Sequence, residues 1–320
     1  MPSISSAPPL GRRIYVSGSM AYDRIMDFPG KFADHIMPDK IHILNVSFNV
    51  NGLVERMGGT AGNIAYALAL LGEQPRILAT IGHDYQRYFA WLQKNGISRE
   101  GLRVIKEEFT AGAYITTDAA DNQITGFNPG AMKHPCRYDI SKADPRRSIG
   151  IIGAGNLDDM MTLPKAYKAK GIPYLFDPAQ SLPIWDGRAL AEALTGAKVL
   201  ISNDYELGLI MKMTKLTKEQ IVRRVGAVVT TKAEQGSVVT TKDGERHVAA
   251  VKLAKKPVDP TGAGDAYRGG FLKGLVTGKS FEESARLGSV IASYAVEVYG
   301  TQSYSFTKRD FEARYKRTFG

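Results

Sequence analysis

The apolar residues of the chain follow two different periods. Short runs rich in β-branched residues predict buried strands, at 13–18, 76–81, 149–152, 174–176, 198–202 and 227–231. Apolar positions with helical spacing predict helices, at 85–95, 163–170, from 204 onward, 263–277, 281–298 and the end of the chain. Strands that alternate with helices are typical of a mostly parallel, doubly wound sheet flanked by helices, so the predicted class is α/β.

Two further parts of the chain predict strands that are not separated by helices. Residues 109–117 and 123–127 flank the polar residues 118–122, which predicts a β-hairpin. Residues 41–50 alternate only loosely between apolar and polar, and they are polar for a strand of the core.

Length and composition set the broad class of protein. A chain of 320 residues suits one large α/β domain, or a domain with a small appendage, and 43% hydrophobic residues support a large core. No apolar run reaches membrane-spanning length, and residues 1–10 lack the basic and apolar regions of a signal peptide. Cys136 is the only cysteine, so no intrachain disulfide can form. We therefore expect a cytoplasmic protein with no membrane partner.

The net charge of +10 would be compatible with nucleic-acid binding. The basic residues are scattered, however, and no basic stripe is interleaved with aromatic residues as single-strand binding requires. We do not expect a nucleic-acid partner, and the charge is better suited to attracting polyanionic nucleotides.

The most informative segment is 257–271, Pro-Val-Asp-Pro-Thr-Gly-Ala-Gly-Asp-Ala-Tyr-Arg-Gly-Gly-Phe. Gly262 and Gly264 allow a tight turn, and the helix predicted after them would direct its unpaired N–H groups to one point, which suits a phosphate. A carboxylate at this point repels a plain anion, but Asp265 could take a proton from a hydroxyl that attacks a phosphoryl group. The short motif alone is equally typical of an ordinary helix start.

The longer string Asp-Pro-Thr-Gly-Ala-Gly-Asp-Ala-Tyr-x-Gly-Gly-Phe resembles the C-terminal signature of the ribokinase/PfkB family of sugar and nucleoside kinases. This resemblance implies that Asp265 is the catalytic base. It also implies that the amides of Gly262, Ala263 and Gly264 form an anion hole for the transferred phosphoryl group.

A second segment, Met-Gly-Gly-Thr-Ala-Gly-Asn at 57–63, precedes an apolar run that predicts a buried helix. It could be only a tight turn before a helix. It resembles the N-terminal signature of the same family, in which the glycine pair and the asparagine hold hydroxyl groups of the substrate. Gly58, Gly59 and Asn63 are therefore expected to bind the substrate, and two signatures in the correct order identify the chain as a member of the family.

The family resemblance implies a ribokinase-like fold with a small β-sheet lid. We expect residues 41–57 and 109–128 to form a discontinuous lid. The α/β catalytic domain would then comprise residues 12–40, 58–108 and 129–320.

Asp23 follows the first predicted strand, where a pair of acceptor oxygens could bind a sugar diol. Taken alone, it is better explained as an aspartate of a turn. The family has a substrate-binding aspartate at this position, so the resemblance favours a role in substrate binding.

Two further strand ends carry candidate ATP-binding residues. Asn203 and Glu206 could cap a helix, and they also match the Asn-x-x-Glu motif that the family associates with magnesium and phosphate. Thr231 and Gly236 resemble the family's Thr-x-Gly-x-x-Gly nucleotide loop, although Ala233 stands where the first glycine is usual.

The loop before the C-terminal signature adds a residue to the nucleotide site. Thr261 is expected to contact ATP. Some family members also bind a monovalent cation such as K⁺ near the positions of Asp259 and Thr261.

The substrate is predicted from weaker features. Residues 122–132 and 300–302 resemble the bacterial adenosine-kinase-type members of the family. Phe48 and Phe127, in the expected lid, could stack on a purine or could only seal the lid. We expect a Mg²⁺- and ATP-dependent kinase that phosphorylates the 5′-hydroxyl of a purine nucleoside, adenosine first.

Two alternatives remain from the sequence. One is a sugar kinase of the ribokinase or fructokinase kind, and the other is a catalytically silent, nucleotide-binding regulator. The presence of Asp265, Asn203 and Glu206 argues against the silent regulator. The protein could be a monomer or a homodimer.

Overall fold

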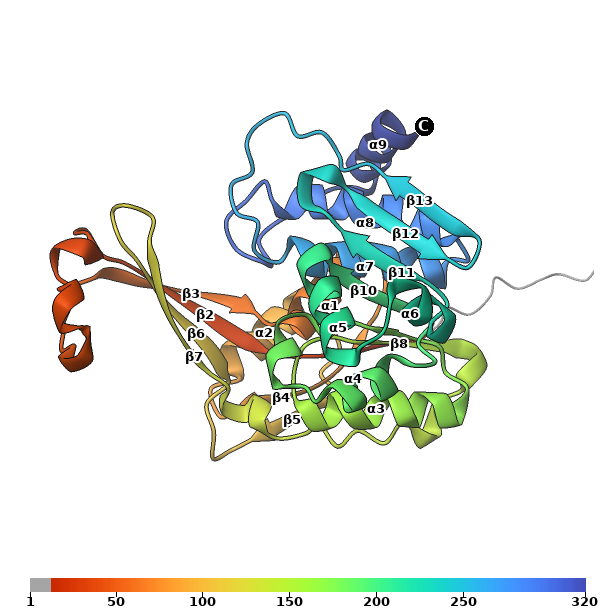
Figure 1. Ribbon diagram of the computed structural model, residues 1–320, viewed down its shortest axis with the longest axis horizontal. Helices are drawn as coiled ribbons and strands as arrows, with labels where there is room; N and C mark the ends of the chain where they lie inside the picture. Colours follow the sequence, from red (N-terminus) through yellow and green to blue (C-terminus); the bar gives the residue numbers. More distant parts are fainter. Residues whose placement is uncertain (1–12) are drawn as a thin grey trace, which may run out of the picture.

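The computed structural model describes residues 13–320, and residues 1–12, including the segment tested for a signal peptide, lie outside the described residues. The described chain builds a nine-stranded sheet in the order β13-β12-β11-β10-β9-β8-β1-β4-β5 (Figure 1). The strands are β1 (Arg13–Ser17), β4 (Arg76–Gly82), β5 (Leu102–Ile105), β8 (Ser148–Ile152), β9 (Tyr174–Phe176), β10 (Val199–Asn203), β11 (Val228–Thr231), β12 (Ser237–Thr241) and β13 (Gly244–Val248). The pairs from β5 to β11 are parallel, and β12 and β13 extend the sheet antiparallel.

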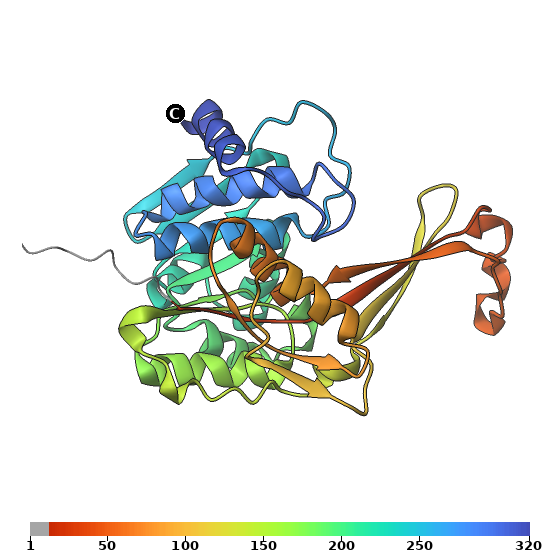
Figure 2. The ribbon, with the colours of Figure 1, turned by 180° about the vertical axis from the view of Figure 1, so that it is seen from behind.

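Two layers of helices cover the sheet, as the alternating pattern predicted (Figure 2). One face packs against α1 (Thr60–Leu70), α2 (Gln86–Lys94), α7 (Ala263–Val276) and α8 (Phe281–Ala295). The other face packs against α3 (Leu157–Lys170), α4 (Gly187–Leu194), α5 (Asp204–Thr214) and α6 (Lys218–Arg224). The last helix, α9 (Lys308–Phe319), packs on α8. Residues of one strand alternate between the two layers: Val16 faces the first cluster and Tyr15 the second, as the pleat of a strand requires.

The apolar face of α1 lies directly against α7, because a glycine permits the close approach. A Cβ on Gly269 of α7 would lie 2.5 Å from the Cβ of Ala67 of α1. A Cβ on Gly270 would lie 2.7 Å from the carbonyl oxygen of Leu287 in α8. The two glycines of the C-terminal motif therefore set the distance of α7 from both of its neighbours.

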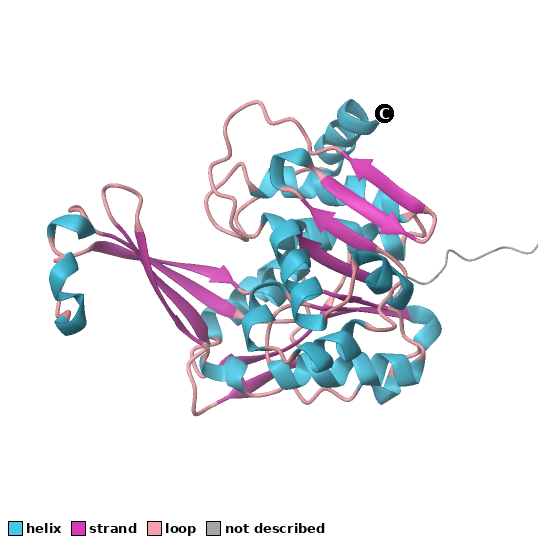
Figure 3. Cartoon of the chain, in the orientation of Figure 1, coloured by secondary structure: helices cyan, strands magenta, loops and turns pink. Residues whose placement is uncertain are grey.

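A second sheet of four strands, in the order β3-β2-β6-β7, projects from the main body (Figure 3). Its strands are β2 (Ala21–Asp27), β3 (Asn51–Gly58), β6 (Ala111–Thr117) and β7 (Gln123–Asn128). The expected hairpin of β6 and β7 is confirmed, with Ala113 opposite Phe127.

The small sheet differs from the prediction in two ways. Its strand β2 lies within residues 12–40, which we expected in the α/β catalytic domain. The strand expected at 41–50 is absent. Residues Pro38–Ile43 form a short 3-10 helix, η2, whose apolar side chains are exposed, Ile43 at 67%. The loose alternation of 41–50 offers no single apolar face for a neighbouring strand, and pairing with β2 begins only at Asn51, opposite Asp27.

Among the described residues, no helix is both long enough and apolar enough to cross a bilayer. Helices α2 and α3 are amphipathic, because buried and exposed positions alternate along each of them.

Candidate active site

Helix α7 begins at the Gly-Ala-Gly turn at residues 262–264, where the sequence predicts a phosphate-binding helix start. Gly262 is its N-cap, with a left-handed φ of 75°, and a Cβ there would lie 2.8 Å from Cγ2 of Thr301. No side chain caps the helix, so its first-turn N–H groups point outward without a side-chain partner. The N–H of Ala263 donates to the carbonyl of Pro260 at 3.2 Å, which leaves Gly264 as the best-placed amide of the expected anion hole.

Asp265 lies in the first turn of α7 and is held by Asn63 from α1. Nδ2 of Asn63 donates to Oδ2 of Asp265 at 2.8 Å. Burial raises the pKa of the Asp265 carboxyl to about 6, although the positive charge of Arg268 and the hydrogen bond from Asn63 act in the opposite direction. A carboxylate with this pKa is ionised at neutral pH and is a stronger base than an ordinary aspartate.

A chain of buried hydrogen bonds orients Asn63 in turn. Nε2 of Gln302 donates to Oδ1 of Asn63 at 3.0 Å and to the hydroxyl of Tyr88 at 2.8 Å. The Tyr88 hydroxyl donates to the carbonyl of Gly58 at 2.8 Å, and Trp91 fixes the Gln302 carbonyl at 2.8 Å. The amide of Asn63 therefore has one partner on each side, which fixes the position of the carboxylate it contacts.

The glycine pair makes room for Asp23 rather than only for a ligand. A Cβ on Gly58 would lie 2.5 Å from Oδ2 of Asp23, and a Cβ on Gly59, whose φ is 86°, would lie 2.6 Å from the carbonyl of Ser19. Burial, together with the smaller effect of the charge of Asp259, raises the pKa of the Asp23 carboxyl to about 6. Asp23, Gly58, Gly59, Asn63 and Asp265 thus converge on one place, as the sequence predicted.

Arg56 was not predicted, and it ties the small sheet to the loop after α8. It lies opposite Asp23 on β3 and donates to the carbonyl of Tyr299. Its positive charge helps to lower the pKa of Asp259, whose carboxylate accepts the N–H groups of Thr261 and Gly300, each at 2.9 Å. Thr261 is thereby held at the surface beside the first turn of α7. Nothing in the sequence indicates Arg56, because its hydrogen-bond partner is a backbone carbonyl 243 positions away.

The residues expected to bind ATP follow two neighbouring strands. Asn203 is paired with Thr231 between β10 and β11. Asn203 and Glu206 form a complete capping box at the start of α5, with hydrogen bonds of 2.7 and 2.8 Å. The capping interpretation is therefore confirmed, and it uses one oxygen of Glu206.

The loop after β11 keeps the shape of a glycine turn without the first glycine. Gly236 has a φ of 84°, and Ala233 has a φ of 47°, a left-handed conformation that costs an alanine about 1–2 kcal/mol. Ala233 therefore adopts a backbone conformation that a glycine would adopt without strain.

A buried ion pair behind Asp265 was also missed. Nη2 of Arg268 donates to Oδ1 of Asp177 at 2.8 Å, and its Nε donates to Oδ2 of the same carboxylate. Arg268 and Asp177 are 5% and 1% exposed. An arginine within an apolar helix, and an aspartate directly after a buried strand, were the signals that could have revealed them. The pair places one fixed positive charge next to Asp265 and Glu206.

The two phenylalanines of the small sheet have different surroundings. Phe48 packs into an aromatic cluster with Phe28 and Phe32, at ring-centroid distances of 4.8 and 5.1 Å, near the far end of β2. Phe127 is 53% exposed and lies in register with Ala113, which is itself in register with Asp23. Phe127 therefore shares the Asp23 face of the sheet, two strands and about 10 Å away.

No group of three or more metal-binding side chains occurs among residues 13–320. Glu206 retains one oxygen outside the capping box and lies near Asp177, whose carboxylate is bound by Arg268. These residues suit a hydrated divalent ion that is held mainly by other ligands, as Mg²⁺ usually is.

The site combines a partly buried carboxylate with uncapped helix amides, at the carboxyl edge of a parallel sheet. Such a base can deprotonate a hydroxyl while the amides stabilise negative charge on a phosphoryl group. The protein is a phosphotransferase that acts on an alcohol group.

Comparison with known proteins gives the family. The model of the pfkB family of carbohydrate kinases matches residues 21–309, so the chain belongs to this family. A nucleoside kinase of Methanocaldococcus jannaschii is 33% identical over 81% of this chain and 85% of the relative. The structure of a nucleoside kinase of Burkholderia thailandensis in complex with inosine is 35% identical, with a TM-score of 0.84 over 96% of this chain and 97% of that one. The ribokinase of Thermotoga maritima, at 23% identity and a TM-score of 0.78, shares the fold.

Replacing the proposed base should slow turnover strongly and reduce its pH dependence. We expect Asp265→Asn to lower kcat by roughly 10²- to 10⁴-fold, because the proton acceptor is lost. In the unchanged protein, kcat/KM should fall about tenfold per unit as the pH drops below about 6, because the raised pKa of Asp265 means that the base becomes protonated there. Steady-state rates from pH 5 to pH 8 measure both effects.

The buried carboxyl of Asp23 also has a pKa of about 6, so the acid limb can be steeper than one proton requires. The Asp265→Asn variant is the control. The pH dependence of its residual rate should no longer contain the contribution of Asp265. Near-normal turnover in the variant, or a flat profile down to pH 5, would contradict the assignment of the base.

A side chain at Gly264 should block the anion hole. A Cβ there would lie 2.7 Å from Nη1 of Arg268, so a valine at the first turn of α7 would need the surrounding groups to shift. We expect Gly264→Val to reduce kcat by roughly 10²-fold or more. Gly208→Val is the matched control, because a Cβ at Gly208 of α5 meets nothing within 4 Å. Equal rates for the two variants would reject the anion hole.

Removing one partner of the buried ion pair should destabilise the fold. Arg268→Met leaves the Asp177 carboxylate without its counter-charge, so we expect a loss of about 3–5 kcal/mol in the free energy of unfolding. The double variant Arg268→Met/Asp177→Leu should recover much of this loss, because no uncompensated charge remains. Urea unfolding measures both, and a single variant as stable as the unchanged protein would show that the pair contributes little.

Proposed function

We propose that the protein is an ATP-dependent kinase that transfers the γ-phosphoryl group to the 5′-hydroxyl of a purine nucleoside, with adenosine the first candidate. The observation that carries the proposal is the match over nearly the whole chain to a nucleoside kinase structure that contains inosine, from Burkholderia thailandensis. A structure of that enzyme in complex with ADP-inosine, at 37% identity, supports ATP as the phosphate donor. Inosine in the relative makes the hypoxanthine nucleoside a second candidate substrate.

The proposed reaction follows from the position of Asp265. Its carboxylate takes the proton of the 5′-hydroxyl as the oxygen attacks the γ-phosphorus and the bond to ADP breaks. The amide of Gly264, at the positive end of α7, stabilises the charge on the transferred group. Asn63 holds the base in position through its 2.8 Å hydrogen bond.

Recognition of the ribose is assigned to the residues around the glycine pair. The Asp23 carboxylate can accept hydrogen bonds from a pair of ribose hydroxyls, and Gly58 leaves space for it by lacking a Cβ. Asn63 and Gly59 line the same turn. Holding the ribose at several points supplies the alignment that makes the 5′-oxygen reactive.

The nucleotide is assigned to Asn203, Thr231, Gly236 and Thr261. Asn203 and Thr231 are adjacent in register at strand ends, where ligands of doubly wound sheets bind. Mg²⁺, when bound with the nucleotide, neutralises phosphate charge, and the free oxygen of Glu206 can hold it through water. A monovalent cation such as K⁺ would lie by Asp259 and Thr261, where the carboxylate already organises two backbone amides.

We further propose that the small sheet is a lid whose closure covers the nucleoside and excludes water. Phe127 is the better candidate to stack on the base, because it lies on the Asp23 face and is exposed. The ring of Phe48 already contacts Phe28 and Phe32, so its part in base binding would require a change at the end of the sheet.

The substrate test compares nucleosides with free sugars. We expect adenosine and inosine to have a much higher kcat/KM than ribose or fructose, because the base adds binding energy that aligns the hydroxyl. Phe127→Ala should lower kcat/KM for nucleosides by about tenfold while leaving residual activity on ribose nearly unchanged. An assay of ADP release with each substrate measures these values.

Ile124→Ala is the matched control, since Ile124 is 46% exposed on the same strand but on its opposite face. Phe48→Ala, tested alongside, reports whether the distal cluster takes part. A preference for ribose or fructose would favour the sugar-kinase alternative. An absence of ADP release with all substrates would favour the silent, nucleotide-binding regulator.

A further inference from the structure

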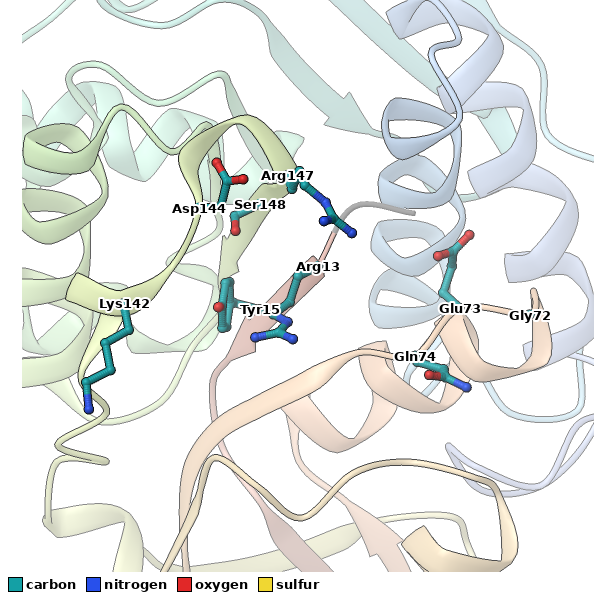
Figure 4. Close-up of a pocket in the computed structure, with 9 residues that line it drawn as sticks. All are labelled: Arg13, Tyr15, Gly72, Glu73, Gln74, Lys142, Asp144, Arg147 and Ser148. Carbon is teal, nitrogen blue, oxygen red and sulfur yellow. The ribbon is translucent and has the colours of Figure 1, made fainter. Parts of the chain in front are cut away.

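A pocket lies at the end of the main sheet opposite to Asp265. It has a volume of about 480 Å³ and is formed where β1 and β8 begin and where the chain turns after α1. Figure 4 shows Arg13, Arg147 and Ser148 grouped on one wall, with Glu73 and Gln74 across from them. None of these residues belongs to the candidate active site. The volume is within the range of small-molecule sites.

The two arginines are brought together by the register of the sheet. Arg13 is paired with Ser148 between β1 and β8, and Arg147 lies one position before Ser148, at the end of the short helix that leads into β8. Two guanidinium groups on neighbouring strand ends repel each other unless an anion lies between them. Within residues 13–320, neither arginine forms an ion pair, and Lys142 adds a third cation to the lining.

The carboxylates of the same pocket already have partners. Glu73 forms an ion pair with Lys273 of α7, and Asp144 accepts the backbone N–H of Arg146 at 3.0 Å as the N-cap of a short helix. The carboxylates that line the pocket therefore do not neutralise the positive charges of Arg13 and Arg147.

A serine completes the lining. Ser148 is 3% exposed as a residue, and it lines the pocket together with the two arginines. Gln74 offers a neutral amide on the facing side. Guanidinium forks, a hydroxyl and an amide are the donors that bind a phosphoryl group with several hydrogen bonds.

We propose that this pocket binds a small phosphorylated ligand, with the phosphoryl group between Arg13, Arg147 and Ser148. The remaining volume takes the rest of the ligand toward Gln74. The site is independent of the proposed kinase reaction, since it lies at the amino ends of the strands whose carboxyl ends carry the substrate residues.

Equilibrium dialysis with radiolabelled inorganic pyrophosphate, in the absence of Mg²⁺, tests the proposal. The catalytic site also binds phosphate groups, so the variants separate the two sites. We expect Arg13→Ala/Arg147→Ala to abolish one class of bound pyrophosphate or weaken it at least tenfold, and Gly264→Val to leave that class intact. Arg13→Lys/Arg147→Lys keeps the charge without the guanidinium fork and should weaken binding less.

The matched control is Lys308→Ala/Arg309→Ala, which removes the same charge from side chains 91% and 92% exposed on α9. It should bind pyrophosphate as the unchanged protein does. The melting temperature and the kinase rate of the Arg13→Ala/Arg147→Ala variant should also be unchanged, which shows that it is folded. Unaltered pyrophosphate binding in that variant, or an equal loss in the α9 control, would overturn the proposal.

Discussion

The contact between Asn63 and Asp265 is the constraint on which the candidate site depends. The two side chains are 202 positions apart in sequence and meet at 2.8 Å only because α1 and α7 pack almost backbone to backbone. Gly269 permits that approach, since any Cβ there would collide with Ala67. The glycines of the C-terminal motif therefore act at two levels: Gly262 and Gly264 form the turn, and Gly269 sets the helix spacing that brings the base to its amide partner.

The basicity of Asp265 results from opposing effects, of which burial is the largest. Burial favours the protonated carboxyl and is the larger contribution, while Arg268 and Asn63 favour the carboxylate, so that the pKa settles at about 6. Arg268 forms an ion pair with Asp177, and the negative charge of Asp177 raises the pKa of Asp265. The ion pair therefore lowers the pKa of Asp265 less than Arg268 alone would. A base that is both ionised at neutral pH and stronger than a solvated aspartate needs this balance.

Much of the fold could be predicted from the sequence, because the alternation of strands and helices is a local pattern. The small sheet was harder: β2 reads Ala-Tyr-Asp-Arg-Ile-Met-Asp, with charges that cross-strand partners such as Glu55 satisfy only in the folded state. The convergence of Asp23, Asn63 and Asp265 was predicted from motifs. The roles of Gln302, Tyr88 and Arg56 were not, since each depends on hydrogen bonds over more than 200 positions or to backbone groups. Arg268 and Asp177 could have been predicted as a buried pair, because each is a charged residue within or next to an apolar segment.

The chemical groups of the site are divided between two parts of the chain with different surroundings. The proposed base and the amides proposed to bind the phosphoryl group lie on α7, which is enclosed between α1 and α8. Asp23, Arg56 and Phe127 lie on strands of the exposed small sheet. Substitutions in the exposed sheet change few core contacts, while those in α7 disturb packing on both of its sides. Divergence within such an architecture can therefore alter which acceptor is recognised while the phosphoryl-transfer apparatus is retained, so that new specificities arise without the chemistry having to be evolved again.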